Sequence, residues 1–266
     1  MYNPDFDYSA FAGKGFLPRL RALTGVTGYR MKNKGTGTVV RDMLLMASRP
    51  HFFALNVFYM LTFMWSIGLN TTLILFLEPP PPAGYGFSNL TVALFYIAPM
   101  LASLIGELFG HWFNDFIANR HIRRSGGTYD AEVRLWTLYV SVVFLVAGLV
   151  LFGYGLKLHL PWIALVMAWA FYMFGVVTET VAITAYALDV FPDYGVEAAA
   201  IIGIFRTSGG FIVNYFQVEW ATSAGPVTAF GIEAGIVAAS FLLVLAAHFM
   251  GQSWRGKYPF PPAKTH

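Results

Sequence analysis

Cysteine is absent from this chain of 266 residues, and charged residues make up only 12% of it. A chain without cysteine forms no disulfide, no thiolate metal site and no cysteine nucleophile. The histidines show no HExxH spacing and no G-x-S-x-G occurs, so the usual signatures of zinc proteases and serine hydrolases are missing. The formal charge of +3 is also small. We expect no enzyme, no metal, no cofactor and no nucleic-acid partner.

Apolar residues are what the sequence has in excess, at 57%, with 17% aromatic. They fall in six stretches, each with about the 20 residues that a helix needs to cross ~30 Å of hydrocarbon. Lipid cannot hydrogen-bond the backbone, so such segments must be helices. The first stretch has no charge and is apolar on all sides, which argues against a large soluble helical protein. The sequence predicts an all-α membrane protein with six transmembrane helices, at 52–77, 89–109, 135–156, 161–183, 198–220 and 226–250.

Positive charge alternates between the segments that connect these stretches. Fifteen of the 17 Lys and Arg residues lie before the first span, in the 110–134 loop or after the last span, whereas the other loops hold only Lys157. The positive-inside rule therefore places both termini and the 110–134 loop in the cytoplasm. We divide the chain into a cytoplasmic linker-like segment (1–51), a six-helix domain (52–250) and a cytoplasmic tail (251–266). The basic segments are suited to contact anionic membrane lipids.

Ionisable residues inside the spans are costly and usually face the bundle interior or a cavity. Glu107 and Glu179 each lie about 27 Å below the outer start of their helices, near the inner edge, and Arg206 lies about 12 Å in from that edge. Because a lone buried cation is expensive, we expect Arg206 to pair with Glu179, Asp189 or Glu107. The alternative for the two glutamates is contact with headgroups or water. Glu233, about 10 Å from the outer face, is a candidate proton or substrate site.

Two cytoplasmic loops carry opposite charge. Asp115 precedes a basic run that contains Arg123 and Arg124, whereas Asp189 and Glu197 flank an acidic loop without a base. Loops of opposite sign on one face predict a latch across a cytoplasmic opening.

Small and polar residues mark two further features. The spacings Gly106-x-x-x-Gly110 and Gly231-x-x-x-Gly235 are typical of closely packed membrane helices. In the first span, Asn70-Thr71 is the best polar cluster for hydrogen bonds to a substrate.

Several of these residues together resemble fungal transporters of the major facilitator superfamily, in the drug:proton antiporter-like branch. The similar segments are Gly106-Glu107-Leu108-Phe109-Gly110 with Asp115, Arg123-Arg124-Ser125-Gly126-Gly127 and Glu132-Val133-Arg134, and Tyr186-Ala187-Leu188-Asp189 with Arg206-Thr207-Ser208-Gly209-Gly210. The resemblance covers nearly the whole chain but only helices seven to twelve of the family. It implies half of a major facilitator fold, with 1–51 as part of the central linker.

The resemblance implies roles for the charged loops. Asp115 and the following arginines would belong to the inner gating loop, and Asp189 would pair with basic loop residues when the inner gate is shut. The family's pathway runs between two six-helix halves. We therefore expect a second half, as a separate chain, a second copy or a part lost by truncation.

Three functions remain open at this point. The leading hypothesis is a proton-coupled secondary transporter, or half of one, that exports a small organic molecule from the cell across the plasma membrane. The second is a membrane scaffold or regulatory half-transporter without transport. The third is an integral membrane enzyme, which the scarcity of clustered His, Asp and Ser disfavours.

Overall fold

The computed structural model describes residues 36–81 and 84–261, and within these ranges the chain is helical without strands. The chain forms two compact units, Met1–Asp42 and Met43–His266. Most of the predicted linker-like segment, 1–35, lies outside the described residues. All six predicted spans belong to the second unit.

The helices follow the predicted stretches with some changes at their ends. They are α3 (Thr36–Ala47), α4 (Pro50–Leu77), α5 (Asn89–Phe95), α6 (Ile97–Arg124), η2 (Ala131–Leu135), α7 (Trp136–Lys157), α8 (Trp162–Val190), η3 (Pro192–Tyr194), α9 (Gly195–Val213), α10 (Gln217–Ala224) and α11 (Pro226–Lys257). Six segments among the described residues are long and apolar enough to cross a membrane, which confirms the predicted fold class of an integral, multi-pass, all-α protein.

The fifth predicted span, 198–220, is wrong at its end. The helix α9 stops at Val213, and the backbone N–H groups of Tyr215 and Phe216 donate to carbonyls only three residues back. This tight turn separates α10 from α9. It also places the Phe216 and Trp220 rings 6.1 Å and 6.2 Å from the ring of Trp65, which packs them into the core.

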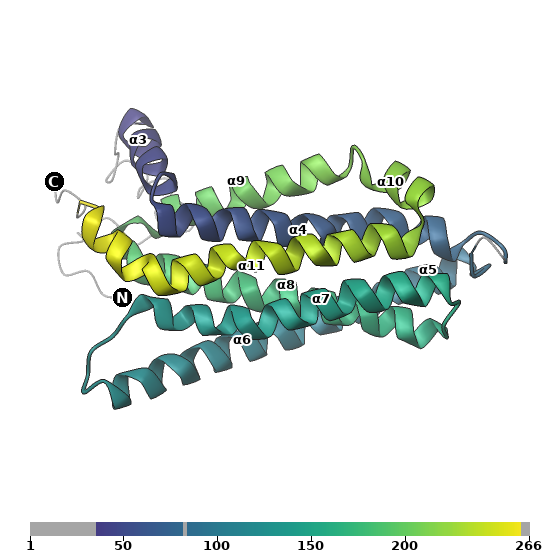
Figure 1. The fold of residues 1–266 in the computed structure, drawn as a ribbon, viewed down its shortest axis with the longest axis horizontal. Coiled ribbons are helices and arrows are strands. Elements are labelled where there is room, and N and C mark those ends of the chain that lie inside the picture. The colour runs from purple at the N-terminus through teal and green to yellow at the C-terminus, as the bar shows by residue number, and fades with distance from the viewer. Residues whose placement is uncertain (1–35, 82–83, 262–266) are drawn as a thin grey trace, which may run out of the picture. The chain divides into compact units, whose positions relative to one another are not determined.

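Within the second unit, the helices pack as a central group with two flanking helices. The helix α8 contacts α7 and α4, and α11 contacts α7 and α4, so these four surround a common core. The helix α6 packs chiefly on α8 and α9 chiefly on α4, and they run along the lower and upper edges of the bundle in Figure 1. Both flanking helices leave most of their circumference uncovered.

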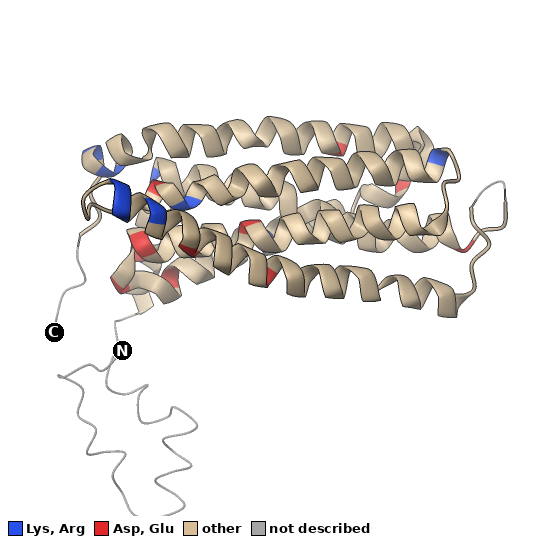
Figure 2. Ribbon diagram, turned by 90° about the horizontal axis from the view of Figure 1, so that it is seen from below, with Lys and Arg blue, Asp and Glu red and all other residues tan. Residues whose placement is uncertain are grey.

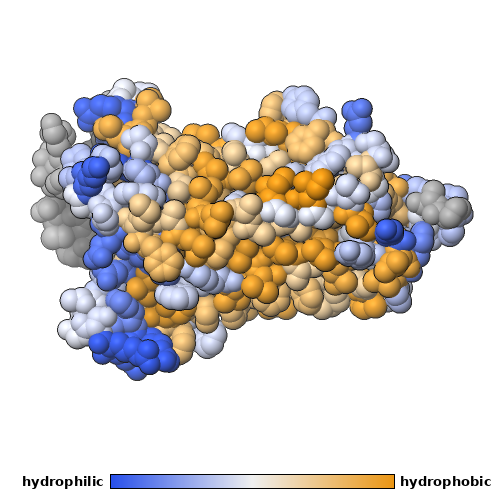
Figure 3. Space-filling view, viewed as in Figure 1, coloured by the Kyte–Doolittle hydropathy of each residue, from blue (hydrophilic) through white to orange (hydrophobic). Residues whose placement is uncertain are grey.

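Two apolar clusters fill the core along the length of the bundle. One includes Trp65, Phe152 and Trp169, and the other includes Phe52, Phe58 and Tyr186. Figure 3 shows apolar side chains over the middle of the face in view and polar ones toward the ends. Burial of these large side chains supplies most of the packing that holds the helices in place.

Basic residues gather at one end of the second unit, as Figure 2 shows. This end, which we call the basic end, holds the last turn of α6 with Arg123 and Arg124 and the last turn of α11 with Arg255 and Lys257. The opposite end holds Lys157, in the last turn of α7. The uneven distribution predicted from the sequence is thus a property of the folded bundle as well.

The two predicted small-residue contacts have different outcomes. Gly106 and Gly110 lie against α8, where an added Cβ would come within 3.0 Å of the Phe174 carbonyl oxygen and 3.1 Å of the Val181 Cβ. Close approach of α6 and α8 is therefore confirmed. Around Gly231 and Gly235 no described atom lies within 4 Å of such a Cβ, so this spacing does not serve packing inside the chain.

Candidate functional site

A charged cluster joins three elements at the basic end. The Arg134 Nε donates to Asp189 Oδ2 at the end of α8, and the Tyr129 hydroxyl donates to the same oxygen. The Arg134 Nη1 lies 3.3 Å from Asp115 Oδ1 and 3.4 Å from Asn114 Oδ1, both on α6. We call Asp115, Tyr129, Arg134 and Asp189 the latch. Through one guanidinium, the latch connects α6, α8 and the loop that precedes α7.

Electrostatics favour a closed latch. The Arg134 side chain is only 17% exposed and that of Asp189 23%, so water screens their attraction less than at an open surface. Partial burial, and then the hydrogen bond to Asp189, raises the pKa of Tyr129 to about 12. The tyrosine therefore remains a hydrogen-bond donor over the whole physiological pH range.

The base that pairs with Asp189 is Arg134, a basic residue of the 110–134 loop, whereas Arg123 and Arg124 were the two named as gating residues. Arg123 and Arg124 make no ion pair in the described part of the chain, although they lie close by in the last turn of α6. Arg134 takes the role because it stands just before the apolar run of α7, level with the end of α8. That position at the membrane edge was the sequence signal that could have identified it.

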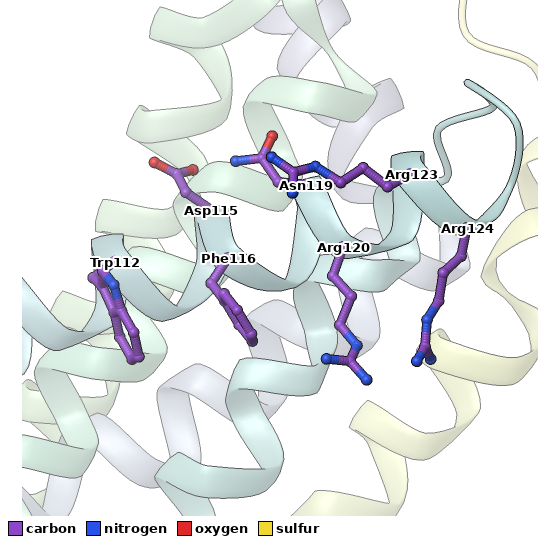
Figure 4. Close-up of a pocket in the computed structure, with 7 residues that line it drawn as sticks. All are labelled: Trp112, Asp115, Phe116, Asn119, Arg120, Arg123 and Arg124. Carbon is purple, nitrogen blue, oxygen red and sulfur yellow. The ribbon is translucent and has the colours of Figure 1, made fainter.

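Arg123 and Arg124 instead line an open pocket of about 600 Å³ along α6. In Figure 4, Arg124 projects on the same side of the helix as Arg120, Phe116 and Trp112, in steps of one turn. Arg123 projects on the other side with Asn119 and Asp115.

A second ion pair reinforces the basic end. The Arg255 guanidinium donates two hydrogen bonds to Glu132, at 2.9 Å and 2.5 Å, and so ties η2 to the end of α11. The glutamate fits there because Gly251 leaves room, since a Cβ on this glycine would lie 2.8 Å from Glu132 Oε1. Bidentate arginine–carboxylate pairs of this kind are strong and directional.

Glu179 lies inside the bundle, with its side chain turned away from the surface. It is fully buried, and the Thr62 hydroxyl donates to its Oε1 at 2.6 Å, whereas Oε2 has no hydrogen-bond partner among the described residues. Next to it, the hydroxyls of Tyr59 and Thr180 are 2.8 Å apart. The alternative of contact with headgroups is thereby excluded for Glu179. Together these four side chains form a buried polar layer between α4 and α8.

The expected ion pair of Arg206 is wrong. Among the described residues Arg206 has no acid within salt-bridge distance, and its guanidinium lies 5.2 Å from the centre of the Phe63 ring. Each expected partner is engaged elsewhere: Asp189 with Arg134, Glu179 with Thr62, and Glu107 with His111 of its own helix at 3.0 Å. The helix α9 turns Arg206 outward, and α6 with Glu107 lies beyond α8.

Arg206 borders a groove of about 510 Å³ between α4 and α9. Besides the cation, its lining holds two aromatic rings, two polar side chains, one aliphatic side chain and a glycine, namely Phe63, Phe211, Thr207, Asn214, Ile67 and Gly210. Asn70 and Thr71 are also exposed on α4, one to two turns further along, and the Thr71 hydroxyl donates to the Gly68 carbonyl oxygen at 3.0 Å. Their role in a substrate pathway remains a prediction, as does a gating role for half-buried Glu197 in the first turn of α9.

Glu233 is fully buried and lines neither of the two pockets described above. The Gln217 Nε2 donates to its Oε1 at 2.5 Å. Gln217, the first residue of α10, belongs to a run that resembles the family but was given no role from the sequence, because a glutamine in an interfacial turn gives no distinctive pattern. In the described residues no group of three or more His, Cys, Asp and Glu side chains is placed to hold a metal ion.

Comparison with known proteins gives relatives among fungal transporters. An uncharacterised MFS-type transporter of Schizosaccharomyces pombe is 24% identical over 66% of this chain and 31% of its own length. The MFS antiporter QDR3 of Candida albicans is 23% identical over 65% of this chain and 25% of its own. The efflux pump radE of Floropilus chiversii is 22% identical over 82% of this chain and 40% of its own. No family model matches, and no solved structure matches.

These relatives confirm the resemblance that the charged motifs indicated. The chain is similar to fungal transporters of the major facilitator superfamily, with an antiporter and an efflux pump among them, and its six spans are consistent with half of that fold. It spans between a quarter and two-fifths of the length of the three relatives named. All three relatives carry names of transport proteins: an MFS-type transporter, an antiporter and an efflux pump.

Proposed function

We propose that this chain is the C-terminal half of a proton-coupled secondary transporter, which exports a small organic molecule by alternating access at the plasma membrane. Both termini and the latch would face the cytoplasm. The relatives support export, because they include a named antiporter and a named efflux pump. Proton coupling is supported by two fully buried carboxyl groups within the spans, Glu179 and Glu233.

The observation that carries the proposal is the open position of Arg206. An arginine about 12 Å inside a membrane helix is costly against lipid. Here it is exposed, has no acidic partner in the part of the chain that the structure describes, and borders a groove with Asn214 and Thr207. Lipid is a poor cover for this surface, whereas a second six-helix body or a water-filled pathway between two bodies covers it well.

In this mechanism the latch acts as one half of the inner gate. The ion pairs of Arg134 hold α6 and α8 together at the basic end. Because partly buried ion pairs have two well-separated states, paired and hydrated, they suit a gate that opens and closes as the halves rock. The substrate would pass between this half and its partner, along the face with Phe63 and Arg206.

The test is transport in proteoliposomes with an imposed proton gradient. The chain alone, as a demonstrated monomer, is expected to show no uptake or efflux of fluorescent cationic or planar drugs. Co-reconstitution with a six-helix N-terminal half from one of the relatives, or with a covalently linked second copy, should give proton-driven transport. Arg206→Gln should reduce that transport at least about tenfold, the effect of losing ~1.4 kcal/mol.

Two outcomes would overturn the proposal. Proton-driven transport by the monomer would show that no second half is required. Tight assembly with a partner half that remains inactive for every drug tested, while the full-length relative is active under the same conditions, would indicate a scaffold.

A further inference from the structure

Gln217 and Glu233 form a buried pair with two oxygen atoms that lack partners. Both residues are fully buried, on α10 and α11. One hydrogen bond joins them, from Gln217 Nε2 to Glu233 Oε1 at 2.5 Å. The Glu233 Oε2 and the Gln217 Oε1 have no hydrogen-bond partner in the described structure. Buried polar atoms are nearly always paired, so two orphans on two bonded side chains need an explanation.

Protonation of Glu233 removes both orphans at once. An ionised carboxylate only accepts hydrogen bonds, whereas a protonated carboxyl also donates one. The donor would be Oε2–H and the acceptor the amide oxygen of Gln217, which closes a ring of two hydrogen bonds between acid and amide. With an ionised carboxylate, both of these oxygens would be acceptors without a donor in a low-dielectric interior, which is unfavourable.

We propose that Glu233 binds a proton and is held in the neutral form by Gln217, so that the pair is a proton-binding site that joins α10 to α11. The ligand of this site is the proton itself. A role of this site in coupling transport to protons deepens the function proposed above and rests on it. The protonation of the Gln217–Glu233 pair itself does not depend on transport.

The fold is shaped around this contact. Gly68 of α4 leaves the space that Gln217 occupies, because a Cβ there would come within 3.1 Å of the glutamine Cδ. The rings of Phe216 and Trp220 flank Gln217 in the chain and both pack against Trp65. The position of the Gln217 amide is therefore set by the space beside Gly68 and by two packed aromatic rings, one before and one after Gln217 in the sequence.

No cation offsets the charge of Glu233. Among the described residues no ion pair includes it. On α8, Tyr172 is the titratable group on which the charge of Glu233 acts, and in α10 the only acid, Glu219, is exposed. Two neighbouring helices bring uncharged residues: α4 places Gly68 beside the pair, and α7 packs Phe152 on Phe230 of α11. The element η2 meets α11 near Gly251, where its Glu132 is already paired with Arg255. The surroundings thus favour the neutral carboxyl.

Loss of the proton would break the second hydrogen bond and set two acceptors against each other. The short helix α10 would then lose its polar anchor on α11. Because α10 connects α9 to α11, this release would change the position of the helix that carries Arg206. A proton bound at Glu233 would in this way be coupled to the groove side of the bundle.

Infrared difference spectroscopy of the chain in detergent tests the protonation directly. Wild type minus Glu233→Gln at neutral pH should contain the C=O stretch of a protonated carboxyl and no carboxylate stretch. Gln217→Leu should move that C=O band to higher frequency, because the amide hydrogen bonds are gone. The matched control is Glu107→Gln, whose difference spectrum should show carboxylate bands, since its side chain is half exposed and beside His111.

A second arm keeps the test decisive if Glu233→Gln does not fold. Glu179→Gln removes the other fully buried carboxyl, so a protonated-carboxyl band that remains in this variant belongs to Glu233. Adding Gln217→Leu should shift the remaining band. Carboxylate bands for Glu233 at neutral pH, or a band indifferent to Gln217→Leu, would overturn the proposal. In a transport-active assembly, Glu233→Gln should uncouple efflux from the proton gradient; an inactive assembly would count against the proposed function and leave the infrared result unaffected.

Discussion

Arg134 and Asp189 are paired across 55 residues of chain, and Tyr129 donates to the same carboxylate oxygen. The arginine sits at the start of a transmembrane segment and the aspartate at the end of the next one. A hydrogen-bonded ion pair between two such ends fixes the relative height of α7 and α8 in the membrane. It also brings α6 into the cluster through Asp115.

The latch predicts unequal effects of its members. Arg134→Ala should lower the free energy of unfolding by about 2 kcal/mol, because it removes charge-assisted hydrogen bonds and leaves Asp189 without a cation. Asp115→Asn should cost less than about 0.5 kcal/mol, since this side chain is 69% exposed. Denaturant unfolding in detergent measures both. Equal losses of unfolding free energy in the two variants would show that Arg134 is not the residue on which the latch depends.

Arg134→Lys should fall between these two values, because an ammonium group replaces the planar fork by a single point charge. In a transport-active assembly the same substitution should weaken the closed inner gate and raise proton leak.

The shifted pKa of Tyr129 gives the latch an alkaline limit. Because the folded pKa of about 12 lies above the ordinary value of ~10, the neutral phenol stabilises the latch fully below pH ~10, and this contribution is lost as the pH rises through about 12. Ultraviolet titration of wild type minus Tyr129→Phe should show phenolate only in that range. Asp189→Asn should bring the titration toward its ordinary position, since the acceptor carboxylate is one cause of the shift. An unshifted wild-type titration would contradict the geometry.

Two glycines provide a matched test of helix packing. Gly106→Val should destabilise the bundle by about 1–3 kcal/mol, because the side chain would collide with the backbone of α8. Gly231→Val, also within a helix but with no described atom near its Cβ, should change stability by no more than about 0.5 kcal/mol. Thermal unfolding in detergent compares them. A large effect at Gly231 in the detergent-solubilised monomer would show that the packing is assigned wrongly.

The topology is open to a simple labelling test, because the chain has no native cysteine. Glu78→Cys and Thr128→Cys place single thiols at exposed positions beyond opposite ends of the spans. With a membrane-impermeant maleimide on intact cells, Glu78→Cys should react and Thr128→Cys should react only after permeabilisation. Labelling of Thr128→Cys in intact cells would reverse the orientation.

The residues of the latch show how far sequence reasoning reaches. Asp189 was predicted to meet a base, because acidic and basic loops alternate along one side of the membrane. The partner was expected among the basic residues of the 110–134 loop, and it is Arg134 of that loop. The sequence did not single out Arg134 from its neighbours, since the choice among neighbouring arginines depends on the rotation and depth of the helix ends. In the same way, the expected partners of Arg206 were near it in depth but were on other faces of the bundle.

The sequence by itself determined the class of the protein, its six spans and its uneven charge. These follow from the cost of exposing backbone and charge to hydrocarbon, which depends on composition and length alone. Only the tertiary structure decided which buried acids have partners, that Gly106 packs while Gly231 does not, and that Gln217 reaches Glu233. Such contacts depend on which face each helix presents to its neighbours, and nearly all-apolar helices carry no strong periodicity that would reveal this face in advance.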